Sequence, residues 1–556
     1  MSGGTVSGEV EAVRRHAADL AARLSPAARR SATIAQERAI LRMLGVDGLD
    51  RAGQPLAASM AERYCSPDRA RLARGVILPF AVALLEYDLP PRELGLEVSS
   101  GAIDLGLEAE LLERPERLAA AEAHASKLLA AALARFDDNK TAARDMRDVL
   151  GLADEPWLGV ALRADEVGPA AEETKALIGE GADIVQVRVP ASWEFAEARR
   201  NAGLETPGLF EAEGARVKDG RRAGGRGPAG KVAERRHGVR GHPALPQRFE
   251  GDLVPAGSQR GLGALRKAAD EAAAERGSYA SLMTVTSAFA APEQAVVAAF
   301  ERIDYVEADP IREIVEDNVD PERALADHAF AHRLQARAGC RLVIGAGPLA
   351  LGADVASGIP SDAATRAGRA LALQALGVEL ALADGLTSDR LLLGAVPDWV
   401  AGDGDACAIL VQAWLRRRVF PNHGLVIGEP VAAGRRRSRT SALVTALSGA
   451  AASLVVLDAS EGNVTESAAE LGAAAAAALA LRAALSDGAM HGDAAELAMR
   501  TLAAANAALE RFAGEGWGSV LGPAGRGIEA ERFGGTAVVE RATGPGSSAR
   551  LIAALT

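Results

Sequence analysis

From Pro156 onward, short runs of branched and apolar residues alternate with longer stretches of helical periodicity. The strand-like runs lie at residues 157–162, 183–189, 279–286, 303–307, 341–344, 425–427 and 454–457. Strands that alternate with helices form parallel sheets, because each crossover returns the chain to the same edge. This many units over about 300 residues predicts an α/β fold with a (β/α)8, TIM-like barrel, and a doubly wound sheet is the alternative.

The flanks of this region lack the alternation. Apolar residues recur at helical spacing over 9–24, 32–44 and 114–136, which predicts an N-terminal helical region over 1–150. The barrel is then expected over 151–470. The remaining residues, 471–556, begin with an alanine-rich helical run and become rich in glycine, so we expect a helical and irregular C-terminal extension.

One segment inside the predicted barrel breaks the pattern. Residues 206–257 are rich in Gly, Arg and Pro, and the part from Arg216 to Arg248 carries few acids. Such a composition cannot bury enough apolar surface to form a core, so it predicts a disordered insert. A polyanion-binding role is the more specific interpretation, and a solvated surface loop is the simpler one.

Charge, cysteine content and hydropathy exclude several classes of protein. The net charge is −12, which argues against a nucleic-acid-binding protein. Cys65, Cys340 and Cys407 are widely spaced and form no metal-binding motif, which is typical of reduced thiols in the cytoplasm. The first 20 residues have no apolar core of a signal peptide, and no stretch is long enough to span a membrane.

Residues that follow strand ends are the informative ones in such a barrel, because active sites lie at the carboxyl ends of the strands. Arg188 and Ser192 follow the second predicted strand, and Ser287 follows the third. A guanidinium, hydroxyls and the amides of a helix start are what a phosphate group needs. Taken singly, each is more simply a surface or capping residue.

Acidic residues also follow predicted strands. Glu307, Asp309 and Arg312 come after the fourth strand, Glu429 after a later one, and Glu461 after the last. A pair such as Glu307 and Glu429 has the chemistry of a general acid and base, which would indicate an unrelated barrel enzyme.

His328 and His332 are four residues apart on a predicted helix, a spacing that is compatible with metal binding. No third ligand accompanies them in the sequence. We therefore expect packed or solvent-facing histidines rather than a metal centre.

The order of several longer segments resembles that of a known family, the alpha subunit of D-lysine 5,6-aminomutase. The resemblance covers residues 32–469 apart from the Gly/Arg-rich insert. It rests on SATIAQERAILRMLGVDGLD, SSGAIDLGL, EPWLGVALRADEVGPAAEETKALIGEGADIVQVRVP, SAFAAPEQAVVAAFERID and DPERALADHAF. No single motif is diagnostic, and the order of the segments is the evidence.

The resemblance implies a subunit built around a TIM barrel that takes part in a radical 1,2-shift of an amino group on lysine or a related amino acid. It implies pyridoxal phosphate and adenosylcobalamin as cofactors. It also implies a smaller beta subunit that binds the cobalamin and supplies the lysine that bonds to pyridoxal phosphate. Arg188, Ser192 and Ser287 match cofactor-contacting positions of the family, and Glu461 falls near a barrel-end glutamate.

Three positions depart from the family pattern. Arg312 stands where the family stacks an aromatic ring on the pyridoxal, and Gly347 and Val426 stand where it anchors the substrate with an aspartate and a lysine. A non-catalytic barrel that binds a partner or effector is therefore the alternative function. The chain's lysines are few, at Lys127, Lys140, Lys175, Lys218, Lys231 and Lys267, and none falls at a predicted strand end. This scarcity agrees with a partner that supplies the amine.

Overall fold

The structure is a computed structural model of the whole chain. It describes residues 3–52, 54–162, 167–187, 256–286, 290–315, 319–345, 362–395, 406–428, 442, 444–456, 469, 471–474, 493–517 and 538–555.

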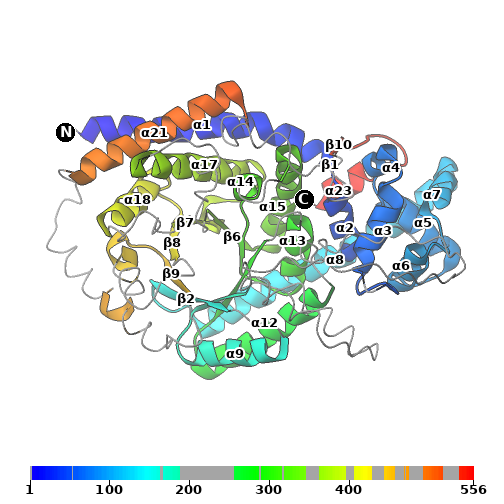
Figure 1. Cartoon of the computed structure of the whole chain (residues 1–556). Coiled ribbons are helices and arrows are strands. Elements are labelled where there is room, and N and C mark those ends of the chain that lie inside the picture. The colour runs from blue at the N-terminus through cyan, green and yellow to red at the C-terminus, as the bar shows by residue number, and fades with distance from the viewer. Residues whose placement is uncertain are drawn as a thin grey trace, which may run out of the picture.

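A closed barrel of parallel strands lies at the centre of the fold (Figure 1). Its strands are β2 (Trp157–Leu162), β3 (Ile184–Val187), β4 (Ser281–Val285), β5 (Tyr305–Glu307), β6 (Arg341–Ile344), β7 (Leu391–Ala395), β8 (Gly424–Gly428) and β9 (Ala452–Val456). Each strand pairs with the next in chain order, and β9 closes on β2 with Trp157 opposite Ala452. The predicted (β/α)8 fold is confirmed, and closure excludes the doubly wound sheet.

Helices lie between successive strands and cover the outside of the barrel (Figure 1). They are α9 (Val167–Gly179), α12 (Ala256–Arg276), α13 (Ala291–Phe300), α14 (Pro310–Val315), α15 (Pro321–Ala338), α17 (Ala363–Ala383) and α18 (Ala406–Val419). Most of them correspond to the stretches of helical periodicity that the sequence shows between the strand-like runs. The predicted insert, residues 206–257, lies outside the described residues except for the first two residues of α12.

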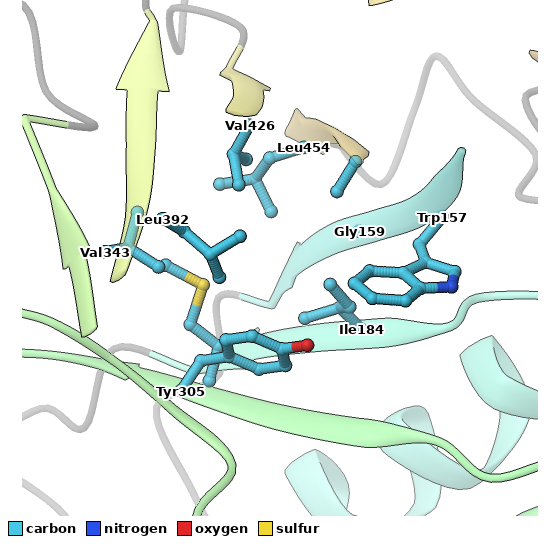
Figure 2. A pocket seen from close by; sticks show the side chains of 10 residues that line it. Trp157, Gly159, Ile184, Tyr305, Val343, Leu392, Val426 and Leu454 are labelled. Carbon is cyan, nitrogen blue, oxygen red and sulfur yellow. The ribbon is translucent and has the colours of Figure 1, made fainter. Parts of the chain in front are cut away.

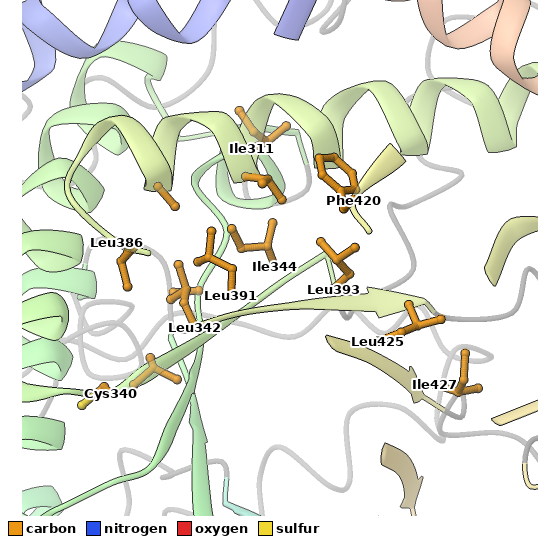
Figure 3. Packing of buried hydrophobic residues seen from close by; sticks show 14 of the residues in the cluster. Ile311, Cys340, Leu342, Ile344, Leu386, Leu391, Leu393, Phe420, Leu425 and Ile427 are labelled. Atoms are coloured by element: carbon orange, nitrogen blue, oxygen red, sulfur yellow. The ribbon is translucent and has the colours of Figure 1, made fainter. Parts of the chain in front are cut away.

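The barrel strands contribute side chains to two apolar clusters, one outside the sheet and one inside it. Outward-facing residues of β6, β7 and β8, such as Leu342, Leu393 and Leu425, point toward the surrounding helices, as Figure 3 shows. Inward-facing residues form a separate cluster that fills the barrel centre, where Tyr305, Leu392 and Val426 meet (Figure 2). This alternation is the side-chain period of a β-strand, and it lets one strand serve both cores.

Helix α1 (Gly3–Arg30) lies across the outside of the barrel. It runs beside α21 (Asp493–Glu515), and both pack on α17 (Figure 1). Val13, Ala17 and Leu20 of α1 belong to the same buried cluster as the barrel's outer face. The first helix is therefore part of the barrel's outer shell.

The following helices form a second body with its own core. It consists of α2 (Ile34–Met43), α3 (Leu56–Cys65), α4 (Arg69–Arg74), α5 (Ile77–Tyr87), α6 (Pro91–Ser100), α7 (Leu105–Glu108) and α8 (Pro115–Leu150). Its apolar cluster extends into α13 and α15 of the barrel. A buried ion triad fixes this junction, because Glu293 of α13 accepts hydrogen bonds from Arg38 Nε at 2.9 Å and Arg42 Nε at 3.0 Å.

The last described segment returns to this second body. Strand β10 (Val539–Glu540) pairs antiparallel with β1 (Ser31–Ala32), and α23 (Ala549–Leu555) buries Ile552 and Leu555 in the second core. Arg541 donates to Glu37 and to Gln36, both at 2.8 Å. Residues about 500 positions apart in sequence are therefore neighbours.

Two elements differ from the sequence prediction. Helix α8 continues to Leu150, well beyond the predicted end at residue 136. Strand β7 was missed, because its run of leucines carries no β-branched residue and gives little indication of a strand. Its signal was a short apolar run that begins directly after the charged Asp389 and Arg390.

Two other expectations concern the membrane and the thiols. None of the helices in the described ranges is long and apolar enough to cross a membrane. Cys65 and Cys340 are buried and free.

Candidate functional site at the carboxyl end of the barrel

The barrel interior changes from apolar to polar along its axis. The level nearer the amino ends of the strands is an apolar plug. It is lined by Trp157, Ile184, Tyr305, Leu392, Val426 and their neighbours (Figure 2). Because strand side chains alternate, the next inward position above Ile184 is Gln186, and the next above Tyr305 is Glu307. On β7 and β8 the corresponding positions are Gly394 and Gly428, which contribute no side chain. Among the described residues, the carboxyl end of the barrel is therefore polar at β3 and β5 and carries no side chain at these positions of β7 and β8.

Glu307 is the centre of this polar level. Its Oε2 accepts a hydrogen bond from Gln186 Nε2 at 2.7 Å, and its Oε1 lies 2.8 Å from Arg312 Nη1. The Glu307 side chain is 9% exposed and that of Arg312 is 16% exposed. The backbone carbonyl of Glu307 accepts hydrogen bonds from both the amide and the hydroxyl of Thr286, at 2.8 and 3.1 Å. We call Gln186, Glu307 and Arg312 the mouth cluster.

The helix that carries Arg312 is held by buried charges on both sides. Asp309 Oδ1 accepts from the amide of Ile311 at 2.9 Å at the start of α14. Burial raises the pKa of Asp309 above its ordinary value, against those bonds and the charge of His328. Glu313 Oε1 lies 2.9 Å from His328 Nε2 on α15. These contacts fix the turn after β5, and with it the position of Arg312.

His328 and His332 are both fully packed inside the protein rather than facing solvent. Burial opposes the charged form of His328, but the charge of Glu313 and its hydrogen bond outweigh it and raise the His328 pKa. His332 Nδ1 lies 3.1 Å from Asp384 Oδ2, and burial lowers the pKa of His332. No group of three potential ligands gathers as a metal site in the described part of the chain. The packed interpretation of the two histidines is therefore supported.

The structure describes only part of the predicted site. Arg312 lies in the mouth cluster together with Glu307, and its backbone amide donates to Asp309 Oδ1 at 3.4 Å. Outside the described residues lie Arg188, Ser192, Ser287, Gly347, Glu429 and Glu461. Val426 faces the apolar plug and is 6% exposed.

Sequence reasoning missed Gln186, Glu313 and His328 as members of this site. Gln186 gave a usable signal, because it is the polar residue within an otherwise apolar run of β3. A polar side chain at an inward position of a barrel strand needs a partner, and Gln186 finds one in Glu307 on β5, two strands away in the sheet. The sequence singled out His328 for its spacing to His332, but no local pattern indicated that it would lie beside Glu313.

The closed barrel with a polar cluster at its carboxyl end defines the chain as a (β/α)8-barrel protein of the kind whose sites lie at that end. Comparison with protein families gives the particular family. The model of the D-lysine 5,6-aminomutase TIM-barrel domain of alpha subunit matches residues 6–192 and 254–432, more than half of the chain. The chain belongs to this family.

Two curated relatives agree with this assignment. The lysine 5,6-aminomutase alpha subunit of Fusobacterium nucleatum subsp. nucleatum is 24% identical over 391 residues, 70% of this chain and 64% of the relative. That of Acetoanaerobium sticklandii is 23% identical over 394 residues, with the same coverage. The matched part thus spans less than two thirds of either relative.

Among solved structures, a dihydropteroate synthase from Anaplasma phagocytophilum matches at 13% identity, over 57% of this chain and 97% of that chain. Its TM-score is 0.32, and we base no argument on it.

Proposed function

We propose that this chain is the barrel subunit of an isomerase, an aminomutase that shifts an amino group between adjacent carbons of lysine or a related amino acid. Family membership over more than half of the chain is the observation that carries the proposal. The mouth cluster supports it, because it places fixed hydrogen-bonding groups at the end of the barrel where such proteins bind their ligands. Pyridoxal phosphate and adenosylcobalamin are the proposed cofactors, and when bound they supply the radical chemistry.

The described residues fit pyridoxal phosphate in two respects. Helix α13 begins just beyond β4 with Ala290 at its N-cap, a residue with no side-chain acceptor for the amides of Ala291 and Glu293, whereas Pro292 has no amide to donate. Arg312 presents a planar guanidinium at the barrel mouth, and such a group stacks on aromatic rings. Arg188, Ser192 and Ser287 would hold the phosphate, and Arg312 would contact the ring. Glu461 completes the proposed set as a barrel-end carboxylate.

A partner is proposed because the described lysines lie on outer helices. Lys175 on α9 pairs with Glu275 at 3.1 Å, and Lys140 is exposed on α8. Lys127 and Lys267 also lie on helices. The amine that bonds to pyridoxal phosphate would then come from a small cobalamin-binding beta subunit. The barrel's own part would be to bind and orient the cofactor and to exclude water from it.

The apolar plug limits where the charged groups of an amino-acid substrate would bind. Val426 packs in the apolar plug, where a substrate's ammonium or carboxylate group would lose its hydration without gaining a partner. A substrate charge would therefore be met at the level of Glu307 and Arg312 or above it. We propose lysine or a related amino acid, bound by groups that differ from the family's aspartate and lysine.

Co-expression with a candidate beta subunit tests the proposal. The complex would be purified and titrated with pyridoxal phosphate, and the absorbance change would report binding. We expect a stable complex and saturable binding, with Arg188→Ala weakening cofactor affinity about tenfold or more because a charge-assisted bond to phosphate is lost. Arg51→Ala is the matched control, since Arg51 is 70% exposed and pairs with Glu97 in the second body.

The departures at Gly347 and Val426 favour a second candidate, a non-catalytic barrel that binds a partner or effector. Amino-shift turnover that Arg188→Ala abolishes and Arg51→Ala leaves intact would exclude it. Failure to form a complex, together with the absence of any pyridoxal-dependent absorbance change, would refute the aminomutase proposal.

A further inference from the structure

A second concave site lies on the opposite side of the barrel from the mouth cluster. It is a cleft of about 470 Å³ between α8, α15 and the turn after α17, lined by Asp137, Lys140, Arg333, Ala336, Arg337, Asp384 and Gly385. Helices α15 and α17 end just before β6 and β7 begin, so the cleft lies at the amino end of the barrel. The proposed aminomutase function assigns nothing to it.

The two acids of the cleft already have cationic partners. Asp137 Oδ2 lies 2.5 Å from Arg337 Nη2. Asp384 accepts from Arg29 Nε and from Ser25, both at 3.0 Å, and its other oxygen lies 3.1 Å from His332. Each carboxylate is therefore already paired with another cation, although the charge of Asp384 still acts on Arg333.

Arg333 and Lys140 remain without a carboxylate partner among the described residues. Arg333 is half-buried and uses only its Nε, which donates to the carbonyl of Ala329 at 3.0 Å. A guanidinium carries five donors, so most of its hydrogen-bonding capacity is unused in the described structure. Burial lowers the pKa of Arg333, and the charges of Arg29 and Arg541 act in the same direction, partly offset by Asp384. The cleft therefore carries an excess of partly desolvated positive charge.

Lys140 is positioned by its neighbour on α15. Gly339 ends that helix with a φ of 81°, and a Cβ built on it would lie 3.1 Å from Lys140 Cγ. The aliphatic stem of Lys140 thus runs across the helix end, and Lys140 is one of the residues that line the cleft. Two cationic side chains, Arg333 of α15 and Lys140 of α8, therefore line the same cleft from two different helices.

We propose that this cleft binds a small phosphate-bearing dianion, independently of the cofactor site at the barrel mouth. Phosphate carries close to two negative charges at neutral pH, which matches the two unpaired cations, and it accepts bonds from Arg and Lys alike. The volume leaves room for a small organic group attached to the phosphate.

Isothermal titration calorimetry of the full chain with inorganic phosphate, at ionic strength held constant with sodium chloride, tests the inference. We expect saturable binding at the cleft in the wild type that is retained when the proposed cofactor phosphate site is removed by Arg188→Ala. Arg333→Gln and Lys140→Glu should each weaken phosphate binding about tenfold or more, since each removes a charge-assisted bond. Arg188→Ala should leave this binding unchanged, which separates the cleft from the proposed cofactor site.

Lys127→Glu is the matched control for Lys140→Glu, because Lys127 is exposed on the same helix about 20 Å away. Phosphate affinity that survives both cleft substitutions, or that Lys127→Glu lowers equally, would overturn the inference. Malonate binding as tightly as phosphate would overturn the phosphate assignment. Should Arg333→Gln not fold, Lys140→Glu still decides the question, since Lys140 is exposed.

Discussion

Glu307 is a largely buried carboxylate at the barrel mouth, and two neighbouring side chains stabilise its charge. A carboxylate inside a protein is tolerated when its oxygens are hydrogen-bonded and its charge is paired. Gln186 and Arg312 meet both conditions for Glu307. The same contacts hold Arg312, the residue that we propose faces the cofactor ring, in one orientation.

Replacing Glu307 with Gln should lower the free energy of unfolding by about 2 to 3 kcal/mol, because a largely buried ion pair is broken. The loss is below that of a fully dry pair, since Arg312 keeps some solvent contact. Urea denaturation measures it. Glu97→Gln is the control, because Glu97 and Arg51 are 36% and 70% exposed and should cost less than about 1 kcal/mol. Equal losses in the two variants would contradict the role given to Glu307.

Asp384, at the amino end of the barrel, shows how buried hydrogen-bond donors lower the pKa of a carboxyl group. Burial raises its pKa, but hydrogen bonding by His332, and then by Arg29 and Ser25, outweighs burial and leaves the pKa below its ordinary value. A carboxyl whose folded-state pKa is depressed contributes stability above the unfolded-state pKa. It loses that stability as the pH falls through the lower folded-state value.

Asp384→Asn should therefore be less stable than the wild type near neutral pH, and the difference should shrink as the pH falls below the ordinary aspartate pKa. Urea midpoints measured across that range give the comparison. Asp145→Asn, at a position that is 62% exposed, should show little difference throughout. A stability difference for Asp384→Asn that stays constant with pH would show that the depressed pKa is not its source.

At the scale of elements, close approach of α17 and α21 shapes the outer shell. Gly368 of α17 faces α21 so closely that a Cβ on it would lie 2.6 Å from the Ala504 Cβ and 2.6 Å from the Thr501 carbonyl. Glycine in a helix interior costs about 1 kcal/mol in helix propensity. At position 368 the absence of a side chain lets α17 and α21 pack closely, in spite of this cost.

Gly368→Ala should destabilise the protein by about 1 to 3 kcal/mol, because overpacking outweighs the gain in helix propensity. Gly514→Ala on α21 should instead stabilise slightly, since nothing lies within 4 Å of its Cβ position. Thermal unfolding of the two variants, measured side by side, gives the result. A Gly368→Ala variant that melts above the wild type would refute the close packing.

At the scale of the whole molecule, the end of the described chain joins the second body. Glu37 is fully buried and accepts from the amide of Val76 at 2.7 Å and from Arg541 at 2.8 Å. The Arg541 guanidinium is 8% exposed. A buried ion pair thus links α2 to the segment that follows β10.

Arg541→Gln should lower the free energy of unfolding by about 3 kcal/mol, because Glu37 would be left buried without its cation. The matched control is Arg30→Gln, which removes an exposed pair with Glu540 at the same β1–β10 junction and should cost less than about 1 kcal/mol. Guanidinium denaturation followed by circular dichroism measures both. Similar losses for the two would mean that the pair does not hold the segment.

The sequence by itself determined the type of fold and the family. Periodicity alone predicted the alternating strands and helices, because a strand repeats every two residues and a helix every 3.6. The order of longer segments identified the family, which the family comparison confirmed. Strand β7 was missed since a short uninterrupted run of leucines shows neither period.

Only the tertiary structure decided which side chains meet. Gln186 and Glu307 are 121 positions apart, and they bond because barrel closure brings the inward faces of β3 and β5 together. Val426 and Glu307 both lie on barrel strands, yet one faces the apolar plug and the other the mouth. Both face inward, and the difference is their level along the barrel axis. The stagger of the strands around the closed sheet sets that level, and no local pattern in the sequence carries that information.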